Sequence, residues 1–95
     1  MPTSRTSVEL EQAPRYMKLL SKHWSHRFPV ELSSEQATIY FGDSGCRLTP
    51  RNGALNIEVW GEKNALPQLQ DIVLDHLQRF ARRGETLRAS WSRDE

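Results

Sequence analysis

The sequence contains a single cysteine and no long apolar segment. Cys46 has no second cysteine with which to form an internal disulfide, which is typical of proteins in the reducing cytoplasm. No run of about 18 apolar residues is present, and this excludes a membrane-spanning helix. Residues 1–5 lack the apolar core of a signal peptide, so we expect a cytoplasmic protein without a membrane partner.

The chain also lacks an excess of charge of one sign. Its 13 Lys and Arg residues and 12 Asp and Glu residues are mixed along the sequence and give a formal net charge of +1. Nucleic-acid binding requires a concentrated basic face, and we therefore expect no nucleic acid as a partner. The 95 residues, of which 37% are hydrophobic, suffice for one small domain.

The spacing of apolar residues predicts two amphipathic helices. The first spans about residues 13–26, and Pro14 suits its first turn. The second has Asn64 as its N-cap, Pro67 in its first turn and Gly84 as a left-handed stop. The apolar positions are Ala13, Met17, Leu20 and Trp24 in the first helix, and Leu66, Leu69, Ile72, Val73, Leu77 and Phe80 in the second.

Alternation of apolar and polar residues predicts short strands at about residues 6–10, 30–32, 38–41, 46–48, 55–60 and 87–91. Asn52-Gly53 is the strongest hairpin signal, because both residues accept positive φ. The element order is β-α-β-β-β-β-α-β. It predicts an α+β fold, an antiparallel sheet of about five to six strands with two helices packed on one face, in a helix-grip or TATA-binding-protein-like arrangement. We expect one domain over residues 6–92, with frayed termini at 1–5 and 93–95.

The three histidines are the main candidate functional residues. With about 100° between successive helix residues, His76 lies inside the apolar stripe of the second helix. His23 lies at the border of the first helix's stripe, and His26 lies on its solvent side. Because both helices cover one sheet, we predict that His23 and His76 approach each other. At least one of the two should then have a pKa below about 6.5.

The sequence leaves three roles open for these histidines. They can be packing residues whose ring nitrogens find backbone or hydroxyl partners. His23 and His76 can instead line a ligand pocket, together with Tyr16 and Trp24. His23, His26 and His76 can also supply metal ligands, although no Cys, Asp or Glu completes a set by its spacing. We expect no cofactor.

Tyr40 and Trp60 fall on the polar face of the predicted sheet, together with Arg47. There they can form a ligand platform or a dimer contact, or serve strand pairing. Four other aromatic residues follow the apolar period and are predicted to lie in the core: Trp24, Phe28, Phe80 and Trp91. The sequence has no nucleophile elbow or phosphate-binding glycine loop, and Cys46 is predicted to be a buried, inert thiol, so we expect no catalytic residues.

Two stretches of the sequence resemble a known bacterial family. They are RYMKLLSKHWSHRFPVE (Arg15 to Glu31) and LQDIVLDHLQRFARR (Leu69 to Arg83), and a strand that bears Trp91 follows them. In combination they are similar to the family catalogued as domain of unknown function 2218, over about Val8 to Trp91. The family pattern often has a cysteine where this chain has Ser21, so a thiol ligand at that position does not carry over.

The resemblance implies a biological context and no activity. The family has no established activity, and its members occur beside, or fused to, siderophore-interacting flavin reductases. This implies a ligand-binding or accessory protein in iron or siderophore metabolism. The alternative is a protein-interaction module, a homodimer or a partner-binding monomer, that uses the outer sheet face at Tyr40 and Trp60.

Overall fold

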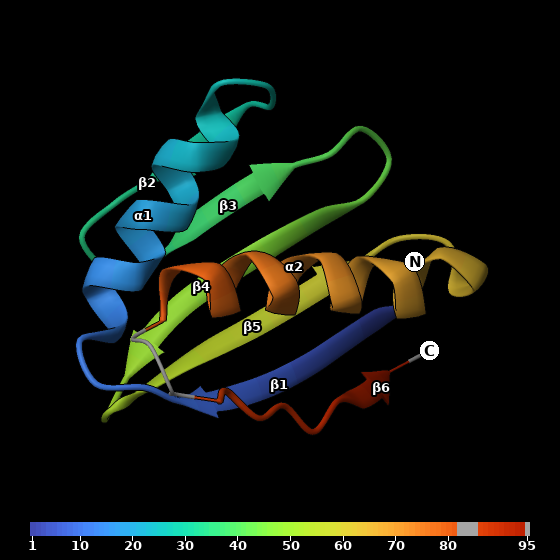
Figure 1. The fold of residues 1–95 in the computed structure, drawn as a ribbon. Helices are drawn as coiled ribbons and strands as arrows, with labels where there is room; N and C mark the ends of the chain where they lie inside the picture. Colours follow the sequence, from blue (N-terminus) through green and yellow to red (C-terminus); the bar gives the residue numbers. More distant parts are fainter. Residues whose placement is uncertain (82–85, 95) are drawn as a thin grey trace.

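The computed structural model describes residues 1–81 and 86–94. Two helices lie across one face of a six-stranded antiparallel sheet (Figure 1). The elements are β1 (Thr3–Glu9), α1 (Ala13–Ser25), β2 (Val30–Leu32), β3 (Ala37–Tyr40), β4 (Gly45–Arg51), β5 (Ala54–Trp60), the 3₁₀ turn η1 (Lys63–Ala65), α2 (Leu66–Phe80) and β6 (Ser92–Asp94). The predicted α+β class and the element order are confirmed.

The sheet has the strand order β2-β3-β4-β5-β1-β6, so the first strand of the chain lies between the fifth and the last. β1 pairs with β5 along its whole length, from Thr3 opposite Trp60 to Glu9 opposite Ala54. α1 packs over the β2, β3 and β4 side of the sheet, and α2 packs over β5 and β1. The two helices therefore share one face and lie side by side on it (Figure 1).

The core lies between this sheet face and the helices. Alternate strand residues point into it, and the inward residues of β4 and β5 are almost completely buried: Cys46, Leu48, Leu55, Ile57 and Val59. Met17 and Leu20 of α1 and Val73 and Leu77 of α2 meet them from above and are fully buried. Burying each such side chain contributes about 1.5–3 kcal/mol, so this single layer of contacts is the main source of stability.

The tight turn between β4 and β5 has the predicted chemistry. Asn52 has a φ of 47° and Gly53 a φ of 78°, the pair of positive values that a two-residue hairpin loop with the right-handed strand twist requires. The backbone N–H of Leu10 also donates to the carbonyl of Gly53 at 3.0 Å. This bond fixes the end of β1 against the hairpin.

Both chain ends differ from the sequence-based expectation. Residues 3–5 and 93–94 fall in the termini that were expected to be frayed, but they lie in β1 and β6, which pair from Thr3 opposite Asp94 to Arg5 opposite Ser92. The strand predicted over residues 87–91 is wrong, because these residues form no ladder with the sheet. Leu87 and Trp91 still pack on the core, which explains their apolar alternation.

Side-chain bonds replace ladder bonds in this segment. The backbone N–H of Leu87 donates to Oε1 of Gln78 at 2.8 Å, and that of Ser90 donates to Oγ1 of Thr6 at 3.1 Å. An alternating pattern reports which residues are buried and not which backbone groups pair. Strand pairing at this end of the chain therefore begins at Ser92, later than the alternation of residues 87–91 predicted.

The start of α2 also differs from its prediction. Asn64 lies inside η1 and is not the N-cap, a position that Ala65 occupies without a side-chain hydrogen bond. The N–H of Ala65 instead donates to the carbonyl of Glu62 at 2.9 Å, so a 3₁₀ turn leads into the helix. Pro67 lies in the first turn as predicted. The predicted stop at Gly84 falls outside the described residues.

No helix in residues 1–81 and 86–94 has the length and apolar character needed to cross a membrane.

Gly45 is covered on the outer sheet face by the indole of Trp60. A Cβ atom at Gly45 would lie 2.2 Å from Cζ2 and 2.6 Å from Cε2 of Trp60, and 2.9 Å from the carbonyl oxygen of Ile39. Gly45 and Trp60 are direct partners in the β4–β5 register. Only glycine leaves room for the indole at this point.

We expect Gly45→Ala to lower the free energy of unfolding by about 1–3 kcal/mol, the usual cost of overpacking. The cost should be smaller in a Trp60→Ala background, because the side chain that the methyl group meets is then absent. Urea denaturation of the four proteins of this double-mutant cycle measures both quantities. An equal cost of Gly45→Ala in the two backgrounds would show that the indole is not the obstacle.

Candidate functional site

A pocket of about 430 Å³ lies between the second half of α1, the first half of α2 and the loop that follows β3. Its apolar walls are formed mainly by Trp24, Phe28, Phe41, Leu69 and Ile72. Its polar groups come from His23, Arg27, Ser44, Gln68 and His76. Small-molecule sites are typically apolar cavities of roughly 300–1,000 Å³ with a few polar groups, and this pocket has that composition.

One wall of the pocket is a chain of aromatic rings. Phe41 meets Trp24 edge-on, with ring centroids 5.3 Å apart and planes at 83°. It meets Phe28 in the same way, at 4.9 Å and 86°. Edge-to-face pairs are favourable because the positive ring edge faces the negative ring face, so the three rings hold one another in place.

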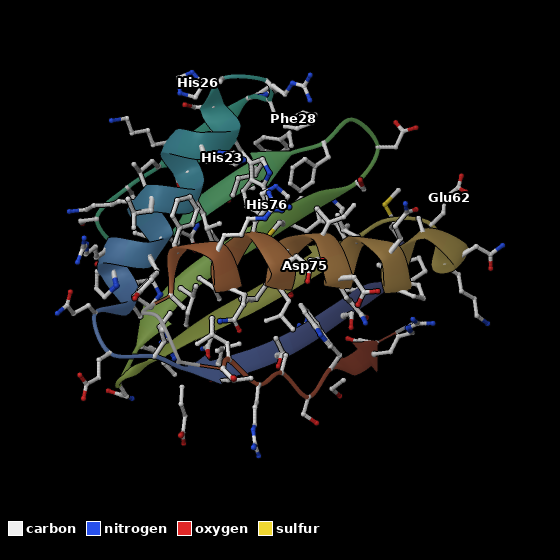
Figure 2. The ribbon with its side chains drawn as sticks, viewed as in Figure 1. His23, His26, Phe28, Glu62, Asp75 and His76 are labelled. Carbon is white, nitrogen blue, oxygen red and sulfur yellow. The ribbon has the colours of Figure 1, made fainter. Side chains whose placement is uncertain are left out.

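His23 and His76 lie together between the helices, as the sequence predicted (Figure 2). Their ring centroids are 5.1 Å apart and their planes are inclined by 48°. The His76 ring also lies 5.2 Å from that of Trp24, so it is flanked by one ring from each of two successive α1 residues. His26 is exposed at the end of α1, which confirms its predicted place on the solvent side.

The orientation of the His76 ring is fixed by its own helix. Its Nδ1 lies 2.7 Å from the carbonyl oxygen of Ile72, one turn earlier. A carbonyl oxygen can only accept, so Nδ1 carries the proton in this contact. In the neutral ring Nε2 is then an acceptor or a potential ligand. A packing histidine is also expected to form a hydrogen bond with the backbone. This contact therefore fits both a packing role and a binding role.

The surroundings of His23 favour its neutral form. Partial burial lowers the pKa of this imidazole from its usual value of 6.5, and the positive charges that His76, Arg79 and His26 can carry lower it further. His23 is nevertheless an exposed side chain, so water reaches one side of the ring. The direction agrees with the prediction that one member of the pair titrates below about 6.5.

The histidines do not form a complete metal site with other protein groups. No set of three or more His, Cys, Asp or Glu side chains is placed to hold a metal ion within residues 1–81 and 86–94. His26 lies apart from the pair, so His23 and His76 would supply two ligands at most. Zinc sites usually take three or four protein ligands, and any metal bound here would need further ligands from elsewhere.

Tyr16 lies outside the pocket that the sequence predicted it to line. It is 7% exposed and packs in the core two turns before His23 on α1. The sequence analysis also did not assign Arg27, Ser44 or Gln68 to the pocket. Arg27 and Ser44 lie in loops, where no periodicity shows which way a side chain points, and a polar residue such as Gln68 gives no burial signal.

Cys46 is fully buried in β4, as predicted. Burial raises the pKa of its thiol far above the usual value, and the Glu58 carboxylate adds to the effect. A thiol that stays protonated is a poor nucleophile and a poor metal ligand. Cys46 is thus a core residue.

The outer face of the sheet carries Tyr40, Arg47 and Trp60, as predicted from the alternation. The guanidinium carbon of Arg47 lies 5.7 Å from the centre of the Trp60 ring. The Tyr40 hydroxyl contacts the Glu31 carboxylate, and this hydrogen bond raises the pKa of Tyr40, with burial and the negative charge of Glu31 as smaller causes. Tyr40 remains 37% exposed.

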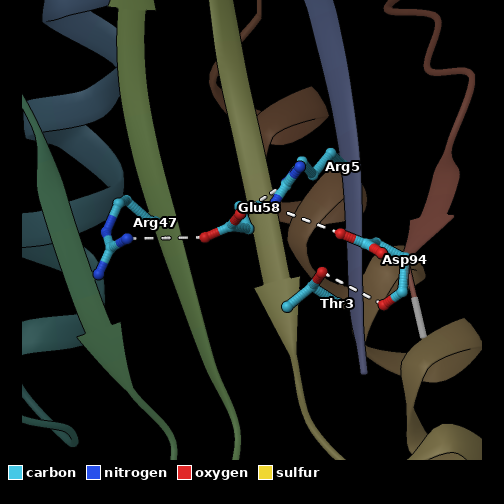
Figure 3. A network of polar contacts seen from close by, with 5 residues as sticks. All are labelled: Thr3, Arg5, Arg47, Glu58 and Asp94. Atoms are coloured by element: carbon cyan, nitrogen blue, oxygen red, sulfur yellow. Dashed lines mark hydrogen bonds and ion pairs between the residues drawn. The ribbon is translucent and has the colours of Figure 1, made fainter. Parts of the chain in front are cut away.

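A line of charges crosses the same face (Figure 3). Nε of Arg5 lies 2.7 Å from Oε2 of Glu58, and Nη1 of Arg47 lies 3.6 Å from Oε1 of the same carboxylate. Nη2 of Arg5 also lies 3.9 Å from Oδ2 of Asp94 in β6. Exposed ion pairs contribute little to stability, so their main effect is to pair the charges of neighbouring strands.

The lowered pKa of His23 predicts how stability depends on pH. The unfolded chain binds a proton at His23 near pH 6.5, and the folded protein binds it only at lower pH. The contribution of His23 is therefore fully present above pH 6.5 and is lost as the pH falls from there towards the folded pKa. Urea denaturation between about pH 5 and 8 measures this slope.

His23→Gln should flatten that slope, because it removes the titrating group. His26→Gln should leave most of the slope, because His26 has the smallest of the four effects that lower the pKa of His23. NMR titration of the imidazole protons gives the folded pKa directly. A pKa of 6.5 or higher for His23 in the native protein would contradict the prediction.

Comparison with known proteins identifies the family. A solved structure, the NMR structure of PA4090 from Pseudomonas aeruginosa, has a TM-score of 0.82 and 39% sequence identity, and the match covers 97% of this chain and 96% of that one. No match was found among curated proteins. The family model described as "uncharacterized protein conserved in bacteria" (DUF2218) matches residues 5–92. The chain therefore belongs to the bacterial family DUF2218.

Proposed function

We propose that this protein is a non-catalytic ligand-binding domain, and that the pocket between α1 and α2 takes a small molecule with a flat aromatic part. The observation that carries the proposal is the position of the two imidazoles beside an aromatic wall in one pocket of about 430 Å³. Apolar walls supply most of the binding free energy in such sites, and a few polar groups orient the ligand. Among the described residues no hydrogen bond joins Ser44, the hydroxyl that lines the pocket, to either histidine, and no carboxylate lines it, so binding is the better supported role.

The family resemblance implies a role in bacterial iron or siderophore metabolism and a location in the cytoplasm. We include both in the proposal. The pocket offers two imidazoles and no carboxylate among the described residues, and hard ferric iron prefers oxygen ligands. Iron would therefore reach the pocket only inside a complex whose own ligands surround it. This favours a chelate or a cofactor-like molecule over the bare ion.

A binding screen tests the proposal. We expect at least one of a ferric siderophore, haem or a flavin to raise the melting temperature and to shift the NMR signals of His23, Trp24 and Phe41. A ligand at about a hundred times its Kd stabilises the folded state by about 2.7 kcal/mol, which is well within reach of a thermal-shift measurement.

Ile72→Trp provides the blocking variant, because Ile72 lines the pocket and is 39% exposed, so a larger side chain can enter without disturbing the core. Leu32→Trp is the matched control, since Leu32 lies on β2 away from the pocket and is 52% exposed. Binding that survives Ile72→Trp unchanged would contradict the proposal, and no binding by any of the three probes would exclude the iron or siderophore context.

A second candidate is homodimerisation through the outer sheet face. Within the described residues no helix covers that face (Figure 1), and it carries charges of both signs in Arg5, Glu58 and Arg47. A two-fold interface must be self-complementary, which a patch of mixed charge allows. Tyr40 is the exposed aromatic residue best suited to anchor such a contact.

Sedimentation velocity over a wide range of protein concentration tests this candidate. Tyr40→Ala and Arg47→Glu should each shift a monomer–dimer equilibrium towards the monomer, whereas Arg15→Glu on the exposed side of α1 should not. Trp60→Ala is a poorer choice, because the indole also covers Gly45 and its loss affects the fold. A wild-type protein that remains monomeric at every concentration would exclude dimerisation by this face.

A further inference from the structure

We infer that the ligand of this pocket is a hydroxylated aromatic acid. Its ring lies against the wall of Trp24 and Phe41, a ring hydroxyl donates to the imidazole pair, and its carboxylate binds Arg27. The inference names the ligand class for the proposed binding function and rests on that function.

The free nitrogens of the imidazole pair favour a ligand that can donate a hydrogen bond. His76 uses its Nδ1 proton on the carbonyl of Ile72, which leaves the lone pair of Nε2 available in the neutral ring. No hydrogen bond joins Nε2 of His76, or either nitrogen of His23, to another residue in the described part of the chain. Each neutral ring therefore presents one free acceptor, the N–H of His23 can donate to the oxygen of the same hydroxyl, and the two rings are only 5.1 Å apart.

The protonation of the pair supports the same assignment. Partial burial and the positive charges that neighbouring side chains can carry lower the pKa of His23, which favours its neutral form. A doubly charged pair would select an anion such as phosphate. A neutral pair accepts protons in hydrogen bonds, and a phenolic hydroxyl, with an ordinary pKa near 10, still carries its proton at neutral pH.

The walls call for a flat ring. Trp24 and Phe28 each stand edge-on to Phe41, so the aromatic wall of the pocket presents ring faces and edges. Another aromatic ring continues such a cluster in an offset or edge-on contact, which contributes about 0.5–1.5 kcal/mol beyond the area that it buries. A volume of about 430 Å³ accommodates a molecule of one or two rings.

The charge of the lining favours an anion. Arg27 is the charged side chain that lines the pocket, and the described residues place no carboxylate there. Arg27 also forms no ion pair with any residue in 1–81 or 86–94. A guanidinium binds a carboxylate through two parallel hydrogen bonds, so a ligand carboxylate gives it a partner that the protein does not supply.

Three related probes separate these requirements: para-hydroxybenzoate has both groups, benzoate lacks the hydroxyl, and para-hydroxybenzyl alcohol lacks the carboxylate. We expect para-hydroxybenzoate to bind about tenfold more tightly than either of the others, as one lost hydrogen bond of about 1.4 kcal/mol implies. Affinities are measured at pH 7.5 by chemical-shift titration of the isotope-labelled protein.

Variants assign each contact. Arg27→Gln should reduce the affinity for para-hydroxybenzoate to that for para-hydroxybenzyl alcohol, and His76→Phe should reduce it to that for benzoate. His23→Phe is the second histidine variant, because His23 is exposed and its substitution leaves the core intact. His26→Gln and Arg15→Gln are the matched controls and should change nothing.

The outcomes distinguish this inference from the function on which it rests. Equal affinity for the three probes at the pocket, or binding of a flavin, haem or siderophore without any response to para-hydroxybenzoate, overturns the ligand class and leaves the binding domain. Absence of binding by every molecule of both sets overturns both. The expected ranking of the three probes supports both the ligand class and the binding function if Arg27→Gln and the histidine variants abolish it.

Discussion

Both helices have to bury their apolar stripes on the same face of one sheet, and the rest of the structure depends on this constraint. The sheet has one inward set of side chains, from Val8 on β1 to Ile39 on β3, and residues of α1 and α2 pack on it. Within residues 1–81 and 86–94 no further helix or strand covers the other face. The outer face therefore stays polar, and the helices are forced into contact with each other.

The pocket is a product of that forced contact. Ile72, His76 and Phe80 follow at four-residue spacing along α2 and form the flank that it turns towards α1. His23 and Trp24 come from the last turns of α1, where the rings of the two helices interleave. The aromatic rings at this place do not fill the angle between the two helices and the loop after β3. The space beside them becomes a pocket, while the layer beneath, at Leu20 and Val73, is closed.

The parts of the structure that could be predicted from the sequence are those determined by local patterns of apolar and turn residues. The two helical stripes, the inward side of β4 and the Asn52-Gly53 turn were predicted because each depends on residues close together in the chain. The approach of His23 and His76 was also predictable, since it needs only the position of each on its helix and a shared sheet face. The shift of the last strand to 92–94 was not, because the chain segment before it uses side-chain bonds to Gln78 and Thr6 that no local pattern encodes. The same holds for Arg27 and Ser44, which reach the pocket from loops.

The two faces of the molecule differ in what they leave available to a partner. On the outer face the polar groups largely satisfy one another: Glu58 binds Arg5 and Arg47, and Tyr40 binds Glu31. A ligand there has to compete with bonds that already exist. In the pocket, the acceptor nitrogens of His23 and His76 have no bond to the described residues, and they lie next to apolar walls that a ligand can cover. A hydrogen bond from a ligand to an unpaired acceptor beside an apolar surface contributes more to binding than the removal of water from that acceptor costs. A group that is already paired within the protein contributes little. The pocket is for this reason the stronger candidate site, although the outer face is the larger surface.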